Sequence, residues 1–325
     1  MKILIVRTDK LGDFITALPT CKILKEYNPQ FKITVCVAAL NRDLALACEF
    51  IDGVIVDDTS SALALAKKLR PYRFELSITL FSNTKVALAQ LLARIPKRIA
   101  PASKLAQIFY THRIVQKRSR VAMAEYEYNI ALAQSHFPDI SLDFKKPLLQ
   151  FSQETVEESF LKFCKKYAIT KPVIAFHPGF GGSSDANWTL DEYLELIQSL
   201  HVKNLQIVMT FGPDENELRK EAIQKAVGLD IIFYSSNEGL VNFAKLLTSF
   251  KLFVSTSTGT YHLAALVGTP TMTFFADSLF ASVKRWKAVS EESLQHPYML
   301  SSKSDTRREQ FQEIKKDLKQ LIHTS

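Results

Sequence analysis

The residues of this chain that could do chemistry gather in three short segments, each of which directly follows an apolar run. The first, RTDKLGDFITALP, carries Asp13 just after Lys10 and Gly12 and at the start of a predicted helix. A carboxylate held at such a place can act as a general base that removes a proton from a hydroxyl group. An aspartate at a loop-to-helix junction more commonly caps the helix, so Asp13 alone supports both interpretations. The segment lacks the glycine spacings of dinucleotide-binding folds and P-loops.

The second segment, HPGFGGSSDANW at residues 177–188, places three glycines and two serines in one turn. Backbone amides and hydroxyl groups in such a turn can contact phosphate oxygens at the start of a helix, where the helix dipole favours negative charge. The third segment, residues 255–270, ends an apolar run in hydroxyl residues and places His262 near the start of a helix that follows Thr258 and Gly259. A single histidine there is more often structural than a ligand contact.

These segments need alternating strands and helices to position them. Apolar runs predict strands in both halves of the chain, and the stretches between them have the periodicity of amphipathic helices. Such alternation indicates mostly parallel sheets covered by helices, with the three segments at the carboxyl edges where ligands bind. The predicted strands are residues 2–7, 32–37, 53–56, 75–80, 98–100, 172–176, 205–210, 231–234, 252–254 and 271–275, and the predicted helices include 13–26, 62–69, 84–94, 123–135, 154–166 and 304–323.

Two domains are expected, because 325 residues exceed a typical single core. We place the boundary in a polar stretch that ends at residue 150, so residues 1–150 form the first domain and residues 151–300 the second. The pattern of residues 301–325 predicts a final helix with an apolar stripe that must be covered. We expect packing across the two domains to cover it, with an in-plane membrane contact as the alternative. The stripe consists of Phe311, Ile314, Leu318 and Leu321 or Ile322.

Charge and composition restrict the partners and the compartment. Lys and Arg together number 41 against 33 for Asp and Glu, a surplus that favours anionic partners. Residues 96–121 carry seven lysines and arginines and no acidic residue. Such a segment could contact a phosphorylated glycolipid, an anionic membrane surface or a nucleic acid, and a solvated basic loop without a partner is the alternative. The N-terminus lacks the apolar stretch of a signal peptide and no run approaches the length of a membrane span, so we expect a cytoplasmic protein.

Taken in this order, the three segments resemble glycosyltransferase family 9, the ADP-heptose:lipopolysaccharide heptosyltransferase family, over nearly the whole chain. That family opens with an apolar strand, Gly-Asp and a helix interrupted by Pro. Later it carries a hydroxyl residue, Gly, two further residues and His-Leu-Ala, and then an Arg-Trp pair. The matching positions are Gly12, Asp13, Pro19, Thr258, Gly259, His262, Leu263, Ala264, Gly268, Pro270, Arg285 and Trp286.

The resemblance implies a GT-B fold of two Rossmann-like domains facing across a cleft, and sugar transfer with inversion and without a metal or other cofactor. It implies an anionic glycolipid acceptor on the first domain and a nucleotide-sugar donor, such as ADP-heptose, on the second. Asp13 would be the general base. Peripheral contact with the cytoplasmic face of the inner membrane is expected, and no nucleic acid. The predicted donor-binding residues are His177, Gly179, Gly181, Gly182, Ser183, Ser184, Trp188, Ser257, Thr258, Gly259 and His262, and the predicted acceptor-binding residues are Lys10, Gly12, Lys97, Arg98, Arg113 and Arg120.

The chain departs from the family pattern at three positions. Ala186 stands where many members carry Lys, Ser257 where an Asp commonly precedes the hydroxyl-Gly pair, and Ala276 where a Gly usually follows the strand. A phosphate-binding charge is therefore missing, and Ser183 and Ser184 are candidates to supply hydrogen bonds in its place. These departures leave the donor open.

Two other functions fit parts of this sequence. A nucleotide-sugar epimerase of the same fold would act on the free donor and need no acceptor. A non-catalytic basic binding protein would use residues 96–121, but that segment lacks the RNP pattern and repeated aromatic spacing of nucleic-acid sites.

Overall fold

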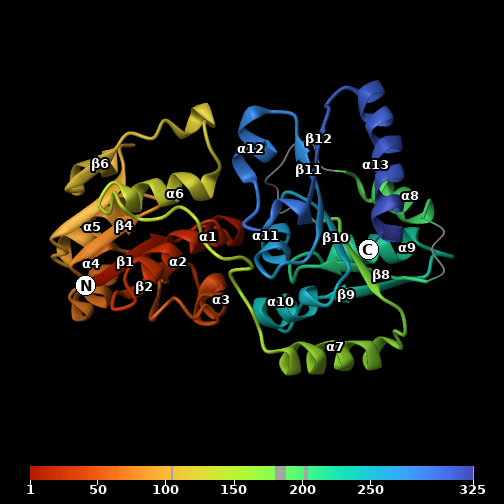
Figure 1. The fold of residues 1–325 in the computed structure, drawn as a ribbon, viewed down its shortest axis with the longest axis horizontal. Helices are drawn as coiled ribbons and strands as arrows, with labels where there is room; N and C mark the ends of the chain where they lie inside the picture. Colours follow the sequence, from red (N-terminus) through yellow and green to blue (C-terminus); the bar gives the residue numbers. More distant parts are fainter. Residues whose placement is uncertain (104, 180–187, 201–203, 325) are drawn as a thin grey trace. The chain divides into compact units, whose positions relative to one another are not determined.

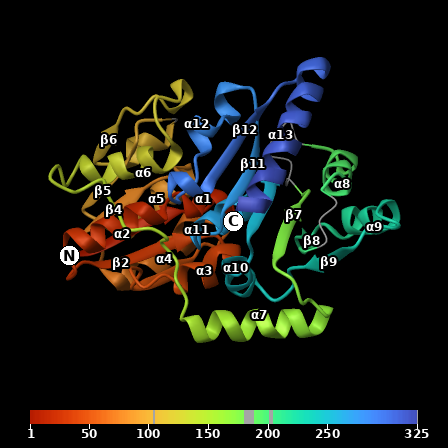
Figure 2. The ribbon, with the colours of Figure 1, turned by 45° about the vertical axis from the view of Figure 1, so that its right-hand side comes forward.

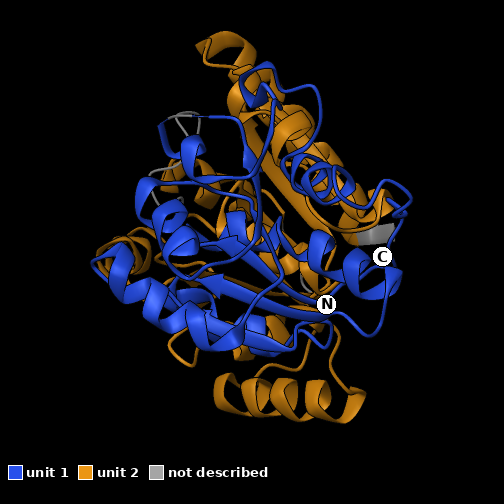
Figure 3. Ribbon diagram, turned by 90° about the vertical axis from the view of Figure 1, so that its left-hand side faces the viewer, with its two compact units in different colours: residues 1–148 blue, residues 149–325 orange. Residues whose placement is uncertain are grey.

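The computed structural model of the chain describes residues 1–103, 105–179, 188–200 and 204–324. It divides into two compact units, Met1–Leu148 and Leu149–Ser325, coloured separately in Figure 3. The division lies two residues before the boundary expected at residue 150. Each unit contains one six-stranded sheet in which all neighbouring strands are parallel.

The sheet of the first unit has the strand order β3-β2-β1-β4-β5-β6. Three of its strands have the predicted bounds, whereas β6 was not predicted, because a three-residue edge strand has no apolar run to reveal it. The strands are β1 Lys2–Arg7, β2 Lys32–Val37, β3 Gly53–Val56, β4 Leu76–Thr79, β5 Lys97–Pro101 and β6 His112–Ile114.

The helices of the first unit differ from prediction at one place that matters for the site. The helix predicted over residues 13–26 is two helices, α1 and α2, because Pro19 has no N–H to bond the carbonyl of Ile15. Alternate residues of β1 divide between the faces of the sheet, and Leu4 and Val6 join the core under α4 and α5. The helices are α1 Leu11–Ile15, α2 Leu18–Tyr27, α3 Arg42–Leu46, α4 Ala62–Leu69, α5 Thr84–Leu92 and α6 Glu125–Gln134.

The sheet of the second unit has the strand order β12-β11-β10-β7-β8-β9. Its edge strand β12 was not predicted, because Pro297 interrupts the pattern; an edge strand tolerates proline, which gives up one ladder hydrogen bond. The strands are β7 Val173–His177, β8 Gln206–Phe211, β9 Ile231–Ser235, β10 Leu252–Thr256, β11 Thr271–Ala276 and β12 Gln295–Leu300.

Helices α8, α9 and α13 share one core with the second sheet, and α7 packs against α10 (Figures 1 and 2). We expected packing across the domains to cover the stripe on the final helix. In the structure the stripe residues Phe311, Ile314, Leu318 and Ile322 lie in the core of the second unit itself. The helices are α7 Gln153–Tyr167, α8 Leu190–Gln198, α9 Asn216–Lys225, α10 Leu240–Thr248, α11 Gly259–Leu266, α12 Val283–Trp286 and α13 Ser304–Thr324.

In each sheet the order of the strands reverses once, between β1 and β4 in the first and between β7 and β10 in the second. Ligands of open parallel sheets bind outside the carboxyl ends of the strands at such a switch point. The three segments singled out in the sequence follow β1, β7 and β10. The topology therefore places every one of them at a switch point.

Candidate active site

A buried arginine organises the switch point of the first unit. Arg7 is the last residue of β1, and its side chain is only 3% exposed. Each of its three nitrogens meets a different carboxylate: Nε donates to Asp9 at 2.8 Å, Nη1 to Glu125 at 3.3 Å, and Nη2 to Asp13. A guanidinium can be buried only when its charge is compensated, and these carboxylates compensate it.

A second layer of contacts holds this cluster from α6. Arg118 donates to the same Glu125 oxygen at 2.5 Å and to Asn129 at 3.3 Å. Asn129 in turn donates to the carbonyl of Thr16 at 3.0 Å, and the hydroxyl of Thr16 donates to the carbonyl of Asp13 at 2.7 Å. Asp13 is thus fixed through both its carboxylate and its backbone.

The position of Asp13 shows that its side chain does not cap the helix. Helix α1 begins at Leu11, and the cap residue Lys10 makes no side-chain capping bond. Asp13 lies inside the first turn and turns its carboxylate toward Arg7 instead of toward helix amides. Its side chain keeps 21% exposure, so the carboxylate can be reached from solvent.

The neighbouring carboxylate, Asp9, has a strongly perturbed titration. Burial raises the pKa of Asp9 to about 6, Arg7 opposes this rise, and the negative charge of Asp13 adds to it. Asp9 therefore changes its charge in the physiological range. Sequence reasoning missed Arg7, Asp9, Arg118 and Glu125; a charged residue closing an apolar strand, as Arg7 does, was the available signal.

The predicted acceptor-binding residues are placed in different ways. Arg113 and Arg120 are exposed and make no ion pair with any described residue. Lys97 Nζ lies 3.5 Å from the His136 ring. Arg98 donates to the carbonyls of Phe109, at 2.8 Å, and of Ile95. We therefore assign Arg98 to holding its own segment together. Lys10 is exposed and Gly12 is buried in α1.

At the switch point of the second unit, His177 ends β7 and is buried. Its Nδ1 lies 3.0 Å from the carbonyl of Thr210, and Ser255 of β10 is its neighbour in the sheet. Burial lowers the pKa of His177, and the nearby Glu215 opposes that shift. The imidazole ties β7 to β8 as a buried group.

Glu215, which sequence reasoning also missed, places its side chain beside Gly179. Its carboxylate accepts a hydrogen bond from the Gly212 amide at 2.6 Å and lies 3.8 Å from His177 Nε2. A Cβ atom on Gly179 would stand 1.8 Å from Glu215 Oε1. A side chain at position 179 would therefore have to displace the flexible end of Glu215.

Of the remaining donor-segment residues, Gly181, Gly182, Ser183 and Ser184 lie outside the described residues. Trp188 is 2% exposed, and its indole stacks on Phe274 with ring centroids 4.0 Å apart. This residue belongs to the core of the second unit. The predicted contact of Trp188 with the donor stays a prediction.

The third segment forms the start of α11. Thr258 is the cap residue and bonds its hydroxyl to that of Thr260 at 2.8 Å, and Ser257 and Gly259 are half-buried beside it. His262 is 2% exposed, and its Nδ1 has no hydrogen-bond partner within the described structure. Burial lowers the pKa of His262 to about 4, so its imidazole is neutral at physiological pH.

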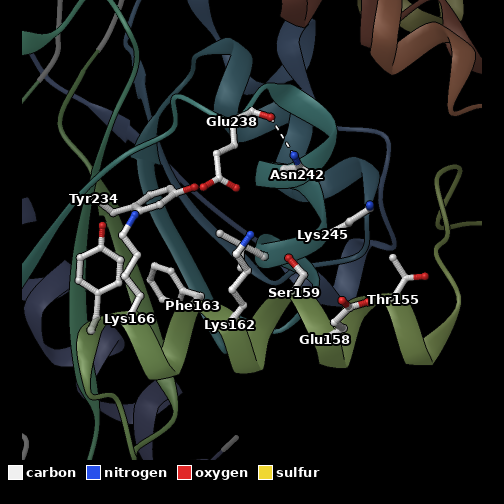
Figure 4. A pocket seen from close by; sticks show the side chains of 12 residues that line it. Thr155, Glu158, Ser159, Lys162, Phe163, Lys166, Tyr234, Glu238, Asn242 and Lys245 are labelled. Atoms are coloured by element: carbon white, nitrogen blue, oxygen red, sulfur yellow. Dashed lines mark hydrogen bonds between the residues drawn. The ribbon is translucent and has the colours of Figure 1, made fainter.

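A separate cavity of about 210 Å³ lies between α7 and α10 (Figure 4). It mixes three lysines, two glutamates and aromatic rings. None of its lining residues belongs to β7, β10 or the segments that follow them. We therefore do not assign it to the site.

The described residues contain no group of three or more His, Cys, Asp or Glu side chains arranged to hold a metal ion. The three carboxylates around Arg7 are bound to guanidinium groups. No described helix combines the length and the apolar character needed to cross a membrane.

Two parallel α/β sheets, each with its polar segments at a switch point, define a GT-B-like α/β protein. The model of glycosyltransferase family 9 (heptosyltransferase) matches residues 62–316. The chain is 36% identical over 300 residues to a glycosyltransferase of Haemophilus influenzae, covering 89% of this chain and 86% of that protein. This protein belongs to glycosyltransferase family 9.

Solved structures agree with the fold. The ADP-heptose lipopolysaccharide heptosyltransferase II of Escherichia coli matches with a TM-score of 0.83 and 21% identity, over 100% of this chain and 99% of that one. An E. coli heptosyltransferase solved with ADP-2-deoxy-2-fluoro heptose matches with a TM-score of 0.68 and 20% identity, over 96% and 99%. The predicted family, fold class and transferase activity are confirmed. Membership of glycosyltransferase family 9 favours sugar transfer over the two alternatives, a nucleotide-sugar epimerase and a non-catalytic binding protein.

Proposed function

We propose that this protein transfers a heptose from ADP-heptose to a lipopolysaccharide-core or related cell-envelope glycolipid, with inversion and without a metal ion. The observation that carries the proposal is the Asp13 carboxylate, held by buried Arg7 at the switch point of the first sheet and still 21% exposed. The heptosyltransferases among the relatives support the class of donor and acceptor.

In the proposed step, an acceptor hydroxyl gives its proton to Asp13 while its oxygen bonds to the anomeric carbon of the donor sugar. The bond from that carbon to the diphosphate oxygen breaks, and its electron pair leaves with ADP. One displacement of this kind inverts the anomeric centre. The charge that grows on the diphosphate would be met by backbone amides at the start of α11 and by the Thr258 hydroxyl.

The proposal includes contact of the first unit with the membrane that carries the acceptor. Leu105, Ile108 and Val115 are 85%, 68% and 70% exposed, and the cations Arg113 and Arg120 lie in the same stretch of chain. Exposed apolar side chains beside cations suit an anionic lipid surface. Changing Leu105 and Ile108 together to Ser should weaken cosedimentation with vesicles that contain anionic lipid, and unchanged cosedimentation would contradict the contact.

Replacing Asp13 by Asn tests the catalytic role directly. The amide keeps the shape but cannot take the proton, so kcat with ADP-heptose and a truncated lipopolysaccharide acceptor should fall by roughly 10²-fold or more. Calorimetry should show ADP-heptose binding unchanged. Asp43→Asn is the matched control, because Asp43 is an exposed aspartate of the same unit.

Two results would overturn this assignment. Wild-type kinetics in the Asp13→Asn enzyme would remove Asp13 from the reaction. Thermal-shift measurements with ADP-, UDP-, GDP- and CMP-sugars test the donor, and stabilisation by another nucleotide-sugar without stabilisation by ADP-heptose would change it.

A further inference from the structure

Two aspartates share one guanidinium at the first switch point, and the proposed transfer step uses only one of them. Arg7 Nε donates to Asp9 Oδ1 at 2.8 Å, and Arg7 Nη2 donates to Asp13 Oδ1. Nε and Nη2 lie on the same edge of the guanidinium, an edge that commonly binds both oxygens of a single carboxylate. Here the edge is divided between two carboxylates.

The rest of the cluster leaves Asp9 dependent on Arg7. Glu125 forms ion pairs with both Arg7 and Arg118. Among the described residues, Asp9 and Asp13 form ion pairs with Arg7 alone. The Asn41 side chain donates to the backbone carbonyl of Asp9 and not to its carboxylate. Asp9 and Asp13 therefore compete for one positive charge.

We propose that Asp9 is a positioning residue for Asp13, which by competing for Arg7 leaves the Asp13 carboxylate able to accept the acceptor's proton. This inference rests on the proposed role of Asp13 as the base. A carboxylate with a guanidinium to itself is a weaker base, because the ion pair stabilises its charged form. Sharing Arg7 with Asp9 reduces that stabilisation.

The arrangement predicts a pH dependence of transfer. Two charged groups face Asp9: Arg7, at the end of β1, and Asp13, in α1. Glu125 and Arg118 are the next charged residues behind Arg7. Burial and the charge of Asp13 bring the pKa of Asp9 to about 6 against the pull of Arg7. As the pH falls through 6, Asp9 gains a proton and becomes neutral. Arg7 then pairs more strongly with Asp13. The rate kcat should therefore fall with a midpoint near pH 6.

The Asp9→Asn enzyme tests this competition. A neutral side chain leaves Arg7 to Asp13 at every pH, so kcat at pH 8 should fall roughly three- to tenfold and the step near pH 6 should disappear. The KM for the acceptor should stay within about twofold of wild type. Asp9→Glu restores the charge and should recover most of kcat, and Asp43→Asn should behave as wild type.

A measurement without substrates checks the coupling in the folded protein. Carbon-13 NMR of labelled aspartate side chains should show Asp9 titrating near pH 6 in the wild type. In Asp13→Asn the midpoint should move to lower pH, because a negative neighbour is gone and Arg7 is free for Asp9.

Each outcome decides the matter. Wild-type kcat with the pH step retained in Asp9→Asn, or an Asp9 midpoint unmoved by Asp13→Asn, would overturn the positioning role. A raised acceptor KM with unchanged kcat would make Asp9 a substrate contact and also overturn it. Full activity in Asp13→Asn would instead overturn the proposed function. Because that result comes from a different variant than the Asp9→Asn result, the two failures can be distinguished.

Discussion

The two switch points hold their polar groups in opposite ways. In the first unit the groups are ionised and paired, with buried Arg7 bound to three carboxylates. In the second unit the buried imidazoles His177 and His262 have pKa values lowered by burial, and the Ser255 hydroxyl beside His177 is buried and uncharged. At the first switch point the charged groups are paired with one another, whereas at the second the histidines are buried with lowered pKa values and the Glu215 carboxylate lies beside His177.

This difference follows the chemistry proposed for each edge. A carboxylate must be ionised to act as the base, and an ionised carboxylate at a mostly buried position needs a cation to hold it. A donor diphosphate brings its own negative charge, so neutral donors and helix amides can receive it. A neutral group left unpaired costs about 1–3 kcal/mol, which is less than an unpaired buried charge costs.

The largest effect on this contrast is expected from Arg7→Met. Arg7 is the one cation that pairs with Asp9 and Asp13 among the described residues, and removing its guanidinium also takes one cation from Glu125, so the free energy of unfolding should fall by about 3–5 kcal/mol. The sugar-transfer activity of this variant should be lost as well. Urea unfolding and kcat measure the two effects. Arg7→Lys keeps the charge but cannot contact three carboxylates at once, so it should fold and still lose much of kcat.

Arg42→Met is the control for that comparison. Arg42 pairs with Asp43 at 2.9 Å, but both side chains are more than half exposed. An exposed pair contributes about 0–1 kcal/mol, so this variant should be close to wild type in stability and activity. Equal losses in Arg7→Met and Arg42→Met would show that the buried cluster has no special role.

Sequence patterns predicted the scaffold of both edges well. The bounds of β1 and β2 match the apolar runs, because a parallel strand buried on both faces is continuously apolar, and the bounds of the edge strand β3 match its short apolar run as well. The strands β6 and β12 were missed, since short or proline-containing edge strands do not show this signal. The break between α1 and α2 falls at Pro19, where the family resemblance implied an interrupted helix, although periodicity alone predicted a single helix.

The site was only half accessible to sequence reasoning. Asp13 was found because Gly-Asp follows a strand, which is a local pattern. Glu125 could not be found in this way, because its contact with Arg7 joins residues 118 positions apart. Glu215 meets Gly179 across two strands for the same reason. Side-chain contacts between distant segments depend on the sheet order, which periodicity does not determine.

The smallest effect, and the sharpest contrast with the first edge, is expected in the pH dependence of donor binding. His262 has a pKa of about 4, so its imidazole should not gain a proton between pH 8 and pH 5.5, and burial also lowers the pKa of His177. The diphosphate of a nucleotide-sugar stays ionised over the same range. The Kd for ADP-heptose, measured by calorimetry, should therefore change less than about twofold, while kcat falls below pH 6 as Asp9 gains its proton. Binding that tightened tenfold as the pH dropped through 6.5 would mean that a protonated histidine holds the diphosphate, and the two edges would then both depend on charge.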